Sequence, residues 1–233
     1  TRRILFTLES RATYGYAKNV FLAMRDFPEL EPLSIVTGMH LIPELGLSVD
    51  LIRANGFPIA AEIPFAPADE SAGAWSRALG QGIAGFADAF ERLKPDMVLL
   101  SGDRIETLGC CLAASYMNIP TAHVQAGDKS GHVDDISRMA IAKLAHLHFA
   151  SSASSAERVR RLGEQEFRTF NVGAPQLDDI VNGDFSGTEL IVGDRHLDLA
   201  GDYILLLQHP VMVEKEEAGE QIVTSLRACL DTG

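Results

Sequence analysis

The feature that most constrains the fold is a strand–helix–strand unit in the middle of the chain. Residues 97–103 (MVLLSGD) form a short, continuous apolar run that ends at Gly-Asp, which is typical of a strand buried on both faces. A helix over 105–118 and a second strand over 121–127 (TAHVQAG) follow. Parallel strands joined in this way end at one sheet edge, where open α/β sheets bind their ligands. We therefore expect Asp103 and the polar loop over 125–138 to face one crevice.

Strands and helices alternate along the rest of the chain as well. This alternation predicts an α/β fold with a doubly wound, parallel, Rossmann-like sheet. The other expected strands cover residues 3–8, 30–41, 58–65, 145–152 and 167–175, and the other expected helices cover 16–27, 44–57, 71–93 and 154–163.

The sequence changes character in its last quarter. Residues 176–202 are acidic and rich in glycine, which is typical of a connector. Residues 203–211 (YILLLQHPV) then predict a buried strand, and 214–230 an amphipathic helix. Because one strand and one helix cannot bury their apolar faces alone, we expect a complete domain over 1–175 and the start of a second, similar domain over 203–233. The chain is accordingly predicted to be a fragment of a longer two-domain protein.

Charge and composition narrow the classes of function. The 233 residues include 20 Lys+Arg and 32 Asp+Glu, and the net charge of −12 argues against nucleic acid or an anionic membrane as partner. No apolar run reaches the roughly 18–20 residues of a membrane span, and the first residues lack the pattern of a signal peptide. Cys110 and Cys111 are adjacent and Cys229 stands alone, so we predict buried thiols, no zinc site and a cytoplasmic location.

The first predicted strand-to-helix turn, ESRATYG, is a usual place for phosphate contacts at a helix N-terminus. It contains neither GxGxxG nor a P-loop lysine, so neither a dinucleotide site nor a Walker-type ATP site is predicted. Arg11 is the one strong cation of this turn. Two interpretations stay open: a phosphate clamp, because a guanidinium can bind two oxygens at once, or a solvated loop charge.

Several uncommon strings occur in a fixed order: SRATYG, VTGMHLIPELG, LLSGDRIE, NIPTAHVQAGDKSGHVDDISR, AIAKLAHLHF, RVRRLGE, NVGAPQLDDI and QHPV. In this order they resemble the hydrolysing UDP-N-acetylglucosamine 2-epimerase family, in particular its sialic-acid-type branch. The resemblance implies a two-domain, glycosyltransferase-B-like fold and a homodimer. It also implies elimination of UDP from a UDP-linked 2-acetamido sugar, followed by addition of water to the glycal. The product is the free 2-epimeric sugar, N-acetylmannosamine in the commonest case, and neither a metal nor NAD takes part.

The same resemblance implies roles for individual residues. Asp103 in GDR and Asp134 in HVDD match two acidic catalytic positions of the family. Arg11 matches an arginine that touches the nucleotide phosphates, Arg138 an arginine near the sugar, and His209 in QHP a histidine that faces UDP. Carboxylates can move protons at C2 of the sugar, whereas cations can stabilise the departing UDP. From local sequence alone, Asp103 is also typical of a helix N-cap, and His209 of a core or turn histidine.

Two positions depart from the family pattern. Where the motif has HIEGGE this chain has HVQAGD, so Gln125 replaces the catalytic glutamate, and Met139 replaces a histidine. A glutamine can orient a hydroxyl or a water but cannot exchange a proton near neutral pH. One hypothesis is that Asp128 or Asp134 takes the missing proton role. The alternatives are a different nucleotide sugar, a glycosyltransferase, or a nucleotide-sugar binder that has lost hydrolysis.

Overall fold

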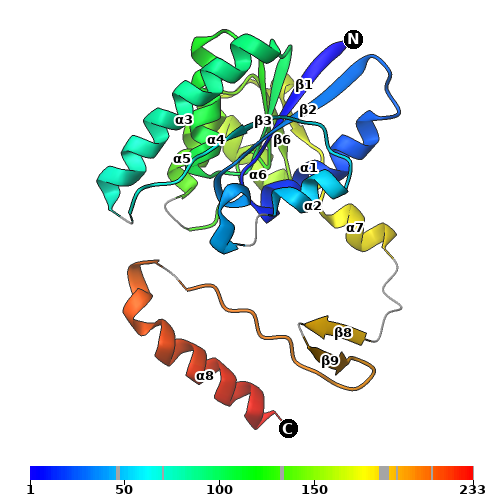
Figure 1. The fold of residues 1–233 in the computed structure, drawn as a ribbon, viewed down its shortest axis with the longest axis vertical. Coiled ribbons are helices and arrows are strands. Elements are labelled where there is room, and N and C mark those ends of the chain that lie inside the picture. Colours follow the sequence, from blue (N-terminus) through cyan, green and yellow to red (C-terminus); the bar gives the residue numbers. More distant parts are fainter. Residues whose placement is uncertain are drawn as a thin grey trace. The chain divides into compact units, whose positions relative to one another are not determined.

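The chain forms two compact units, residues 1–183 and 184–233, which are described separately (Figure 1). The structure is a computed structural model, and it describes residues 1–45, 48–69, 71–131, 134–183, 189–192, 194–210 and 212–232. No helix within these ranges is long and apolar enough to cross a membrane.

The first unit is built on a seven-stranded parallel sheet in the order β3-β2-β1-β4-β5-β6-β7. The order reverses between β1 and β4, which is the topological switch point of doubly wound sheets. The carboxyl ends of β1, β4 and β5 therefore lie side by side, and the predicted parallel, Rossmann-like α/β sheet is confirmed. The strands are β1 (Arg2–Leu8), β2 (Leu30–Thr37), β3 (Ile59–Ile63), β4 (Met97–Ser101), β5 (Thr121–Val124), β6 (Leu147–Ala150) and β7 (Thr169–Asn171).

Helices cover both faces of this sheet (Figure 1). On one face, α1 (Arg11–Met24) and α2 (Val49–Ala54) bury aromatic side chains such as Phe21 against the strands. On the other face, α3, α4 and α5 form a second core, where Cys110 and Cys111 are buried free thiols as predicted. These three helices and the two that follow are α3 (Ala72–Leu93), α4 (Ile105–Tyr116), α5 (Asp134–Leu144), α6 (Ala153–Arg161) and α7 (Leu177–Asn182).

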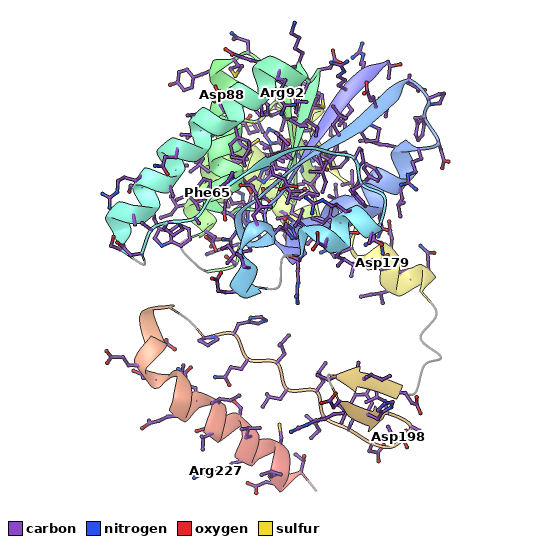
Figure 2. The ribbon with its side chains drawn as sticks, viewed as in Figure 1. Phe65, Asp88, Arg92, Asp179, Asp198 and Arg227 are labelled. Carbon is purple, nitrogen blue, oxygen red and sulfur yellow. The ribbon has the colours of Figure 1, made fainter. Side chains whose placement is uncertain are left out.

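Local sequence explains why α1 and α3 begin where they do. Ser10 and Thr13 form a capping box, in which each side chain accepts a hydrogen bond from the backbone N–H of the other, at 3.4 and 2.9 Å. Ser71 caps α3 by accepting from the backbone N–H of Ala74 at 3.2 Å. Inside α3, Gly82 leaves room for the ring of Phe65, which is labelled in Figure 2. A side chain at position 82 would collide with that ring.

The second unit contains little regular structure. An antiparallel hairpin of β8 (Glu189–Val192) and β9 (Arg195–Asp198) is followed, further on, by a 3-10 helix (Met212–Glu217) and α8 (Ala218–Asp231). The predicted strand over 203–211 is wrong for residues 203–210, which have no regular secondary structure. No described strand pairs with them, and Leu205 is 83% exposed. Val211 lies outside the described residues.

Further predictions of element boundaries also need correction, beginning with the helix predicted over 16–27, which begins earlier, at Arg11, and ends at Met24. The strand predicted over 30–41 ends at Thr37, because Gly38 has a φ of 57° and begins a 3-10 helix. The helix predicted over 44–57 is shorter, and α2 is its only part with α-helical structure among the described residues, which omit 46 and 47.

The predicted polar loop over 125–138 is also shorter. Asp134, Asp135 and Arg138 belong to α5, whose first turn is stabilised by the two acidic side chains. Residues 132 and 133 of this loop lie outside the described residues. The stretch predicted as a connector, 176–202, contains α7 and the β8–β9 hairpin.

Candidate functional site

The residues predicted to face one crevice lie at the carboxyl edge of the sheet, around the ends of β4 and β5. Asp103 lies in the turn from β4 to α4, and Gln125 and Asp128 lie in the turn that follows β5. Arg138 reaches them from the second turn of α5. Gln125 and Arg138 are buried, whereas Asp103 and Asp128 are half-buried. The structure thus brings together these four residues, which the sequence predicts as parts of one site.

Arg138 is the centre of this group. Its guanidinium forms an ion pair with Asp103, and its Nη1 lies 3.6 Å from Oδ2 of Asp128. The same Nη1 donates a hydrogen bond to the backbone carbonyl of Gln125 at 3.3 Å. A buried guanidinium needs such partners, because an unpaired charge away from water is costly. We refer to Asp103, Arg138 and Asp128 as the Arg138 cluster, which carries one more negative than positive charge.

Asp128 is held from its other side by the turn between β6 and α6. Its Oδ1 accepts hydrogen bonds from Oγ of Ser151 at 2.5 Å and from Oγ of Ser155 at 2.6 Å. Both of its oxygens therefore have partners: two hydroxyls on Oδ1 and the Arg138 guanidinium on Oδ2. This arrangement suits Asp128 to fixing the orientation of Arg138.

The backbone of the loop after β5 is pinned in a conformation that few residues adopt. Gln125 has a φ of 60° and Gly127 a φ of 76°. A Cβ atom at Gly127 would lie 2.7 Å from Cγ2 of Val159, so a side chain does not fit between this loop and α6. Arg158 also donates a hydrogen bond to the carbonyl of Gly127. The strained loop is thus fixed by α6, which is the kind of support that functional sites require.

Tyr16 on α1 approaches the same group of residues from another element. Cε2 of its ring lies 4.0 Å from the place that a Cβ atom at Gly102 would occupy, and the charges of Asp103, Arg138 and Asp128 act on its hydroxyl. Burial and the nearby charge of Asp103 raise the pKa of the Tyr16 phenol, so the phenol keeps its proton at neutral pH. The sequence did not predict Tyr16, because its place depends on how α1 packs against the turn after β4.

His123 in β5 supports the turn that carries Asp103. Its Nε2 lies 2.8 Å from the carbonyl oxygen of Gly102, which has a φ of 82°. Since a carbonyl can only accept, Nε2 carries the proton. Burial lowers the pKa of His123 to about 4, so the ring is neutral near pH 7. The sequence contained one sign of this role: a histidine inside an apolar strand needs a hydrogen-bond partner.

A further acidic residue near the carboxyl edge of the sheet, Glu9, directly follows β1. Its side chain is fully buried, and its Oε1 accepts a hydrogen bond from Oγ1 of Thr107 at 2.7 Å. Burial raises the pKa of Glu9 to about 7, and the neighbouring carboxylate of Glu106 adds to this effect. Glu106 itself accepts two hydrogen bonds from Arg104, at 3.1 and 3.0 Å. Glu9 was not predicted from the sequence.

The remaining predicted site residues lie in three different segments of the chain. Arg11 is the first residue of α1 and is exposed, as a contact for phosphate would be. Asp134 is the first residue of α5 and is half-buried, and its charge acts on Arg104. His209 is exposed in the second unit. Among the described residues, no group of three or more His, Cys, Asp or Glu side chains could hold a metal ion.

A parallel sheet with a charged cluster at the carboxyl ends of two neighbouring strands defines the class, which is that of Rossmann-like domains. A solved structure supports the fold, that of the UDP-N-acetylglucosamine 2-epimerase from Neisseria meningitidis bound to UDP-GlcNAc. It matches with a TM-score of 0.68 at 19% identity, over 77% of this chain and 48% of that chain.

The family follows from the sequence comparisons. The family model described as UDP-N-acetylglucosamine 2-epimerase matches residues 22–232, and the chain belongs to this family. A UDP-N,N'-diacetylbacillosamine 2-epimerase (hydrolyzing) of Legionella pneumophila is 36% identical over 99% of this chain. A GDP/UDP-N,N'-diacetylbacillosamine 2-epimerase (hydrolyzing) of Campylobacter jejuni is 32% identical over the same share. The chain spans 61% and 60% of the length of these two relatives.

Proposed function

We propose that this chain contributes the sugar-side domain of a hydrolysing 2-epimerase that acts on a UDP-linked 2-acetamido sugar. The observation that carries the proposal is the Arg138 cluster, in which Asp103 and Asp128 share one buried guanidinium at the carboxyl ends of β4 and β5. Membership of the 2-epimerase family supports the same reaction. The relatives named as hydrolysing epimerases support it further.

The reaction consists of an elimination and an addition. In the elimination, a base removes the proton from C2 while the C1–O bond to UDP breaks and UDP keeps the electron pair. In the addition, water attaches to C1 of the glycal and a proton returns to C2 from the opposite face. We assign proton transfer to Asp103 and Asp134, and we assign Asp128 to holding Arg138 in place. Gln125 would orient a hydroxyl or a water.

The UDP group needs positive charge and hydrogen-bond donors. We assign Arg11 to the diphosphate, because it is exposed at the N-terminus of α1, where anions bind favourably. We assign His209, in the second unit, to the uridine diphosphate. In this account residues 1–175 form the sugar and catalytic domain, and residues 203–233 begin a UDP-binding domain. A homodimer in the cytoplasm is part of the same proposal.

For the sugar itself, we propose a 2,4-diacetamido sugar. Two relatives that are more than 30% identical over 99% of this chain are named for UDP-N,N'-diacetylbacillosamine. The sequence-based expectation of UDP-N-acetylglucosamine and N-acetylmannosamine is the second candidate. Replacement of the family's glutamate by Gln125 is consistent with a site that differs from that of the sialic-acid-type branch.

The proposal is tested by UDP release from both nucleotide sugars, using the longest form of the protein that carries this chain. We expect turnover with UDP-N,N'-diacetylbacillosamine to exceed that with UDP-N-acetylglucosamine. Asp103→Asn should lower kcat by about a hundredfold or more while leaving substrate binding within a few-fold. Saturable binding without any UDP release would contradict the proposal and favour a nucleotide-sugar binder.

A further inference from the structure

The turn from β4 to α4 has one buried hydroxyl between its two ends. Thr107 lies in the first turn of α4, and its Oγ1 lies 3.3 Å from the carbonyl oxygen of Ser101, the last residue of β4. Asp103 lies between these two residues along the chain. The hydroxyl of Thr107 therefore spans the base of the short turn that carries Asp103.

Glu9 holds this hydroxyl from the neighbouring strand. Oγ1 of Thr107 donates a hydrogen bond to Oε1 of Glu9 at 2.7 Å. The backbone of Glu9 is itself fixed, because its N–H donates to Oγ1 of Thr13 at 3.0 Å and its carbonyl accepts from the N–H of Met39 at 2.9 Å. Since β1 and β4 are neighbours in the sheet, Glu9 ties the turn after β4 to the end of β1.

A carboxyl group is costly at this place. The side chain of Glu9 is fully buried, and the nearby carboxylate of Glu106 further disfavours a charge on it. An apolar side chain of similar size would avoid this cost, so packing alone does not require an acid. What the carboxyl adds is an acceptor for the hydroxyl of Thr107.

We propose that Glu9 is a positioning residue for Asp103, an inference that rests on the proposed function. By holding Thr107, the carboxyl of Glu9 fixes both ends of the turn and thereby the place at which Asp103 meets Arg138 and the sugar. A displacement of about 1 Å can cost about a hundredfold in rate. Because Glu9 is fully buried, it acts through Thr107 and not on the sugar itself.

The test separates turnover from stability in Glu9→Leu, made in the longest form of the protein. The variant removes the acceptor of Thr107 together with the cost of burying a carboxyl, and the hydroxyl of Thr107 can still donate to Ser101. We expect a folded protein whose midpoint of urea unfolding near pH 8 is at least that of the parent. Its kcat for UDP release should fall at least about tenfold, with KM within about threefold of the parent value.

Conservative variants and a matched control complete the test. Glu9→Gln keeps an oxygen that accepts from Thr107, and its kcat should stay within about threefold of the parent value. Thr107→Val removes the same hydrogen bond from its other end and should lose turnover like Glu9→Leu, whereas Thr107→Ser should restore it. Thr169→Val removes a buried hydroxyl that donates to the carbonyl of Gln165 at 3.2 Å, at the amino end of β7, and should leave kcat unchanged.

Two results would overturn the inference. One is that folded Glu9→Leu and Thr107→Val turn over like the parent. The other is that Glu9→Gln loses as much turnover as Glu9→Leu, because an acceptor for Thr107 would then not be what the turn requires. A parent that releases no UDP from either nucleotide sugar would instead refute the proposed function.

Discussion

Because the carboxyl of Glu9 is fully buried, we predict that the free energy of unfolding depends on pH in an unusual way. Its pKa is about 7 in the folded chain, whereas the ordinary value of 4.5 applies to the solvated side chain of the unfolded chain. Between these values the folded state binds more protons, so the free energy of unfolding falls as the pH rises through this window. The stabilisation is complete below about pH 4.5 and is lost above about pH 7.

The size of the effect follows from the two pKa values. Their difference corresponds to about 3 kcal/mol of unfolding free energy between acid and alkaline conditions. Glu9→Gln retains an oxygen that can accept from Thr107 and does not titrate, so it mimics the protonated acid. We expect Glu9→Gln and parent to differ by less than about 1 kcal/mol near pH 5, and the variant to gain about 2–3 kcal/mol relative to parent by about pH 8.5.

Urea unfolding followed by the fluorescence of Trp75 measures this difference. Trp75 is the single tryptophan of the chain and lies on α3 of the first unit. Glu91→Gln, at an exposed position of the same helix, is the control and should show no pH-dependent difference from the parent. A difference between Glu9→Gln and parent that stays constant from pH 5 to about 8.5 would refute the assignment of a raised pKa to Glu9.

Three further predictions concern the site. Asp128→Asn should lower kcat about tenfold to a hundredfold with little change in KM, because Arg138 loses a partner; an unchanged kcat in steady-state assays would contradict this. Gly127→Ala should cost more than about 3 kcal/mol in urea unfolding, since its φ is 76° and its Cβ meets Val159. Gln125→Glu should raise the rate of UDP release by about tenfold or more, because a glutamate restores proton exchange at this position, and no gain in steady-state assays would contradict that explanation.

Much of the first unit could be predicted from the sequence, because its strands are short apolar runs buried on both faces. The run over 97–103 corresponds to β4, and the glycine-aspartate at its end lies at the sheet edge where Asp103 meets Arg138. The run over 203–211 is also rich in aliphatic residues, but no described strand pairs with residues 203–210. An apolar run becomes a strand only when another strand satisfies its backbone groups.

Some residues of the site could be predicted from the sequence and others could not, because contacts between distant elements place the latter. Asp103, Gln125 and Asp128 follow strands, so the parallel topology alone brings them near one another. Packing between elements that are distant along the chain determines where Tyr16, His123 and Glu9 lie. A histidine inside an apolar strand signals a buried hydrogen bond, but no local pattern marks the contacts of Tyr16 and Glu9.

The most direct test of the proposed reaction is proton NMR in heavy water, with UDP-N,N'-diacetylbacillosamine and the longest form of the protein. We predict UDP and a free sugar of inverted configuration at C2, with deuterium in place of the C2 proton, because the proton lost in the elimination is replaced from solvent. Release of a free sugar that keeps its C2 proton and its original configuration would contradict elimination and addition, and would indicate simple hydrolysis at C1.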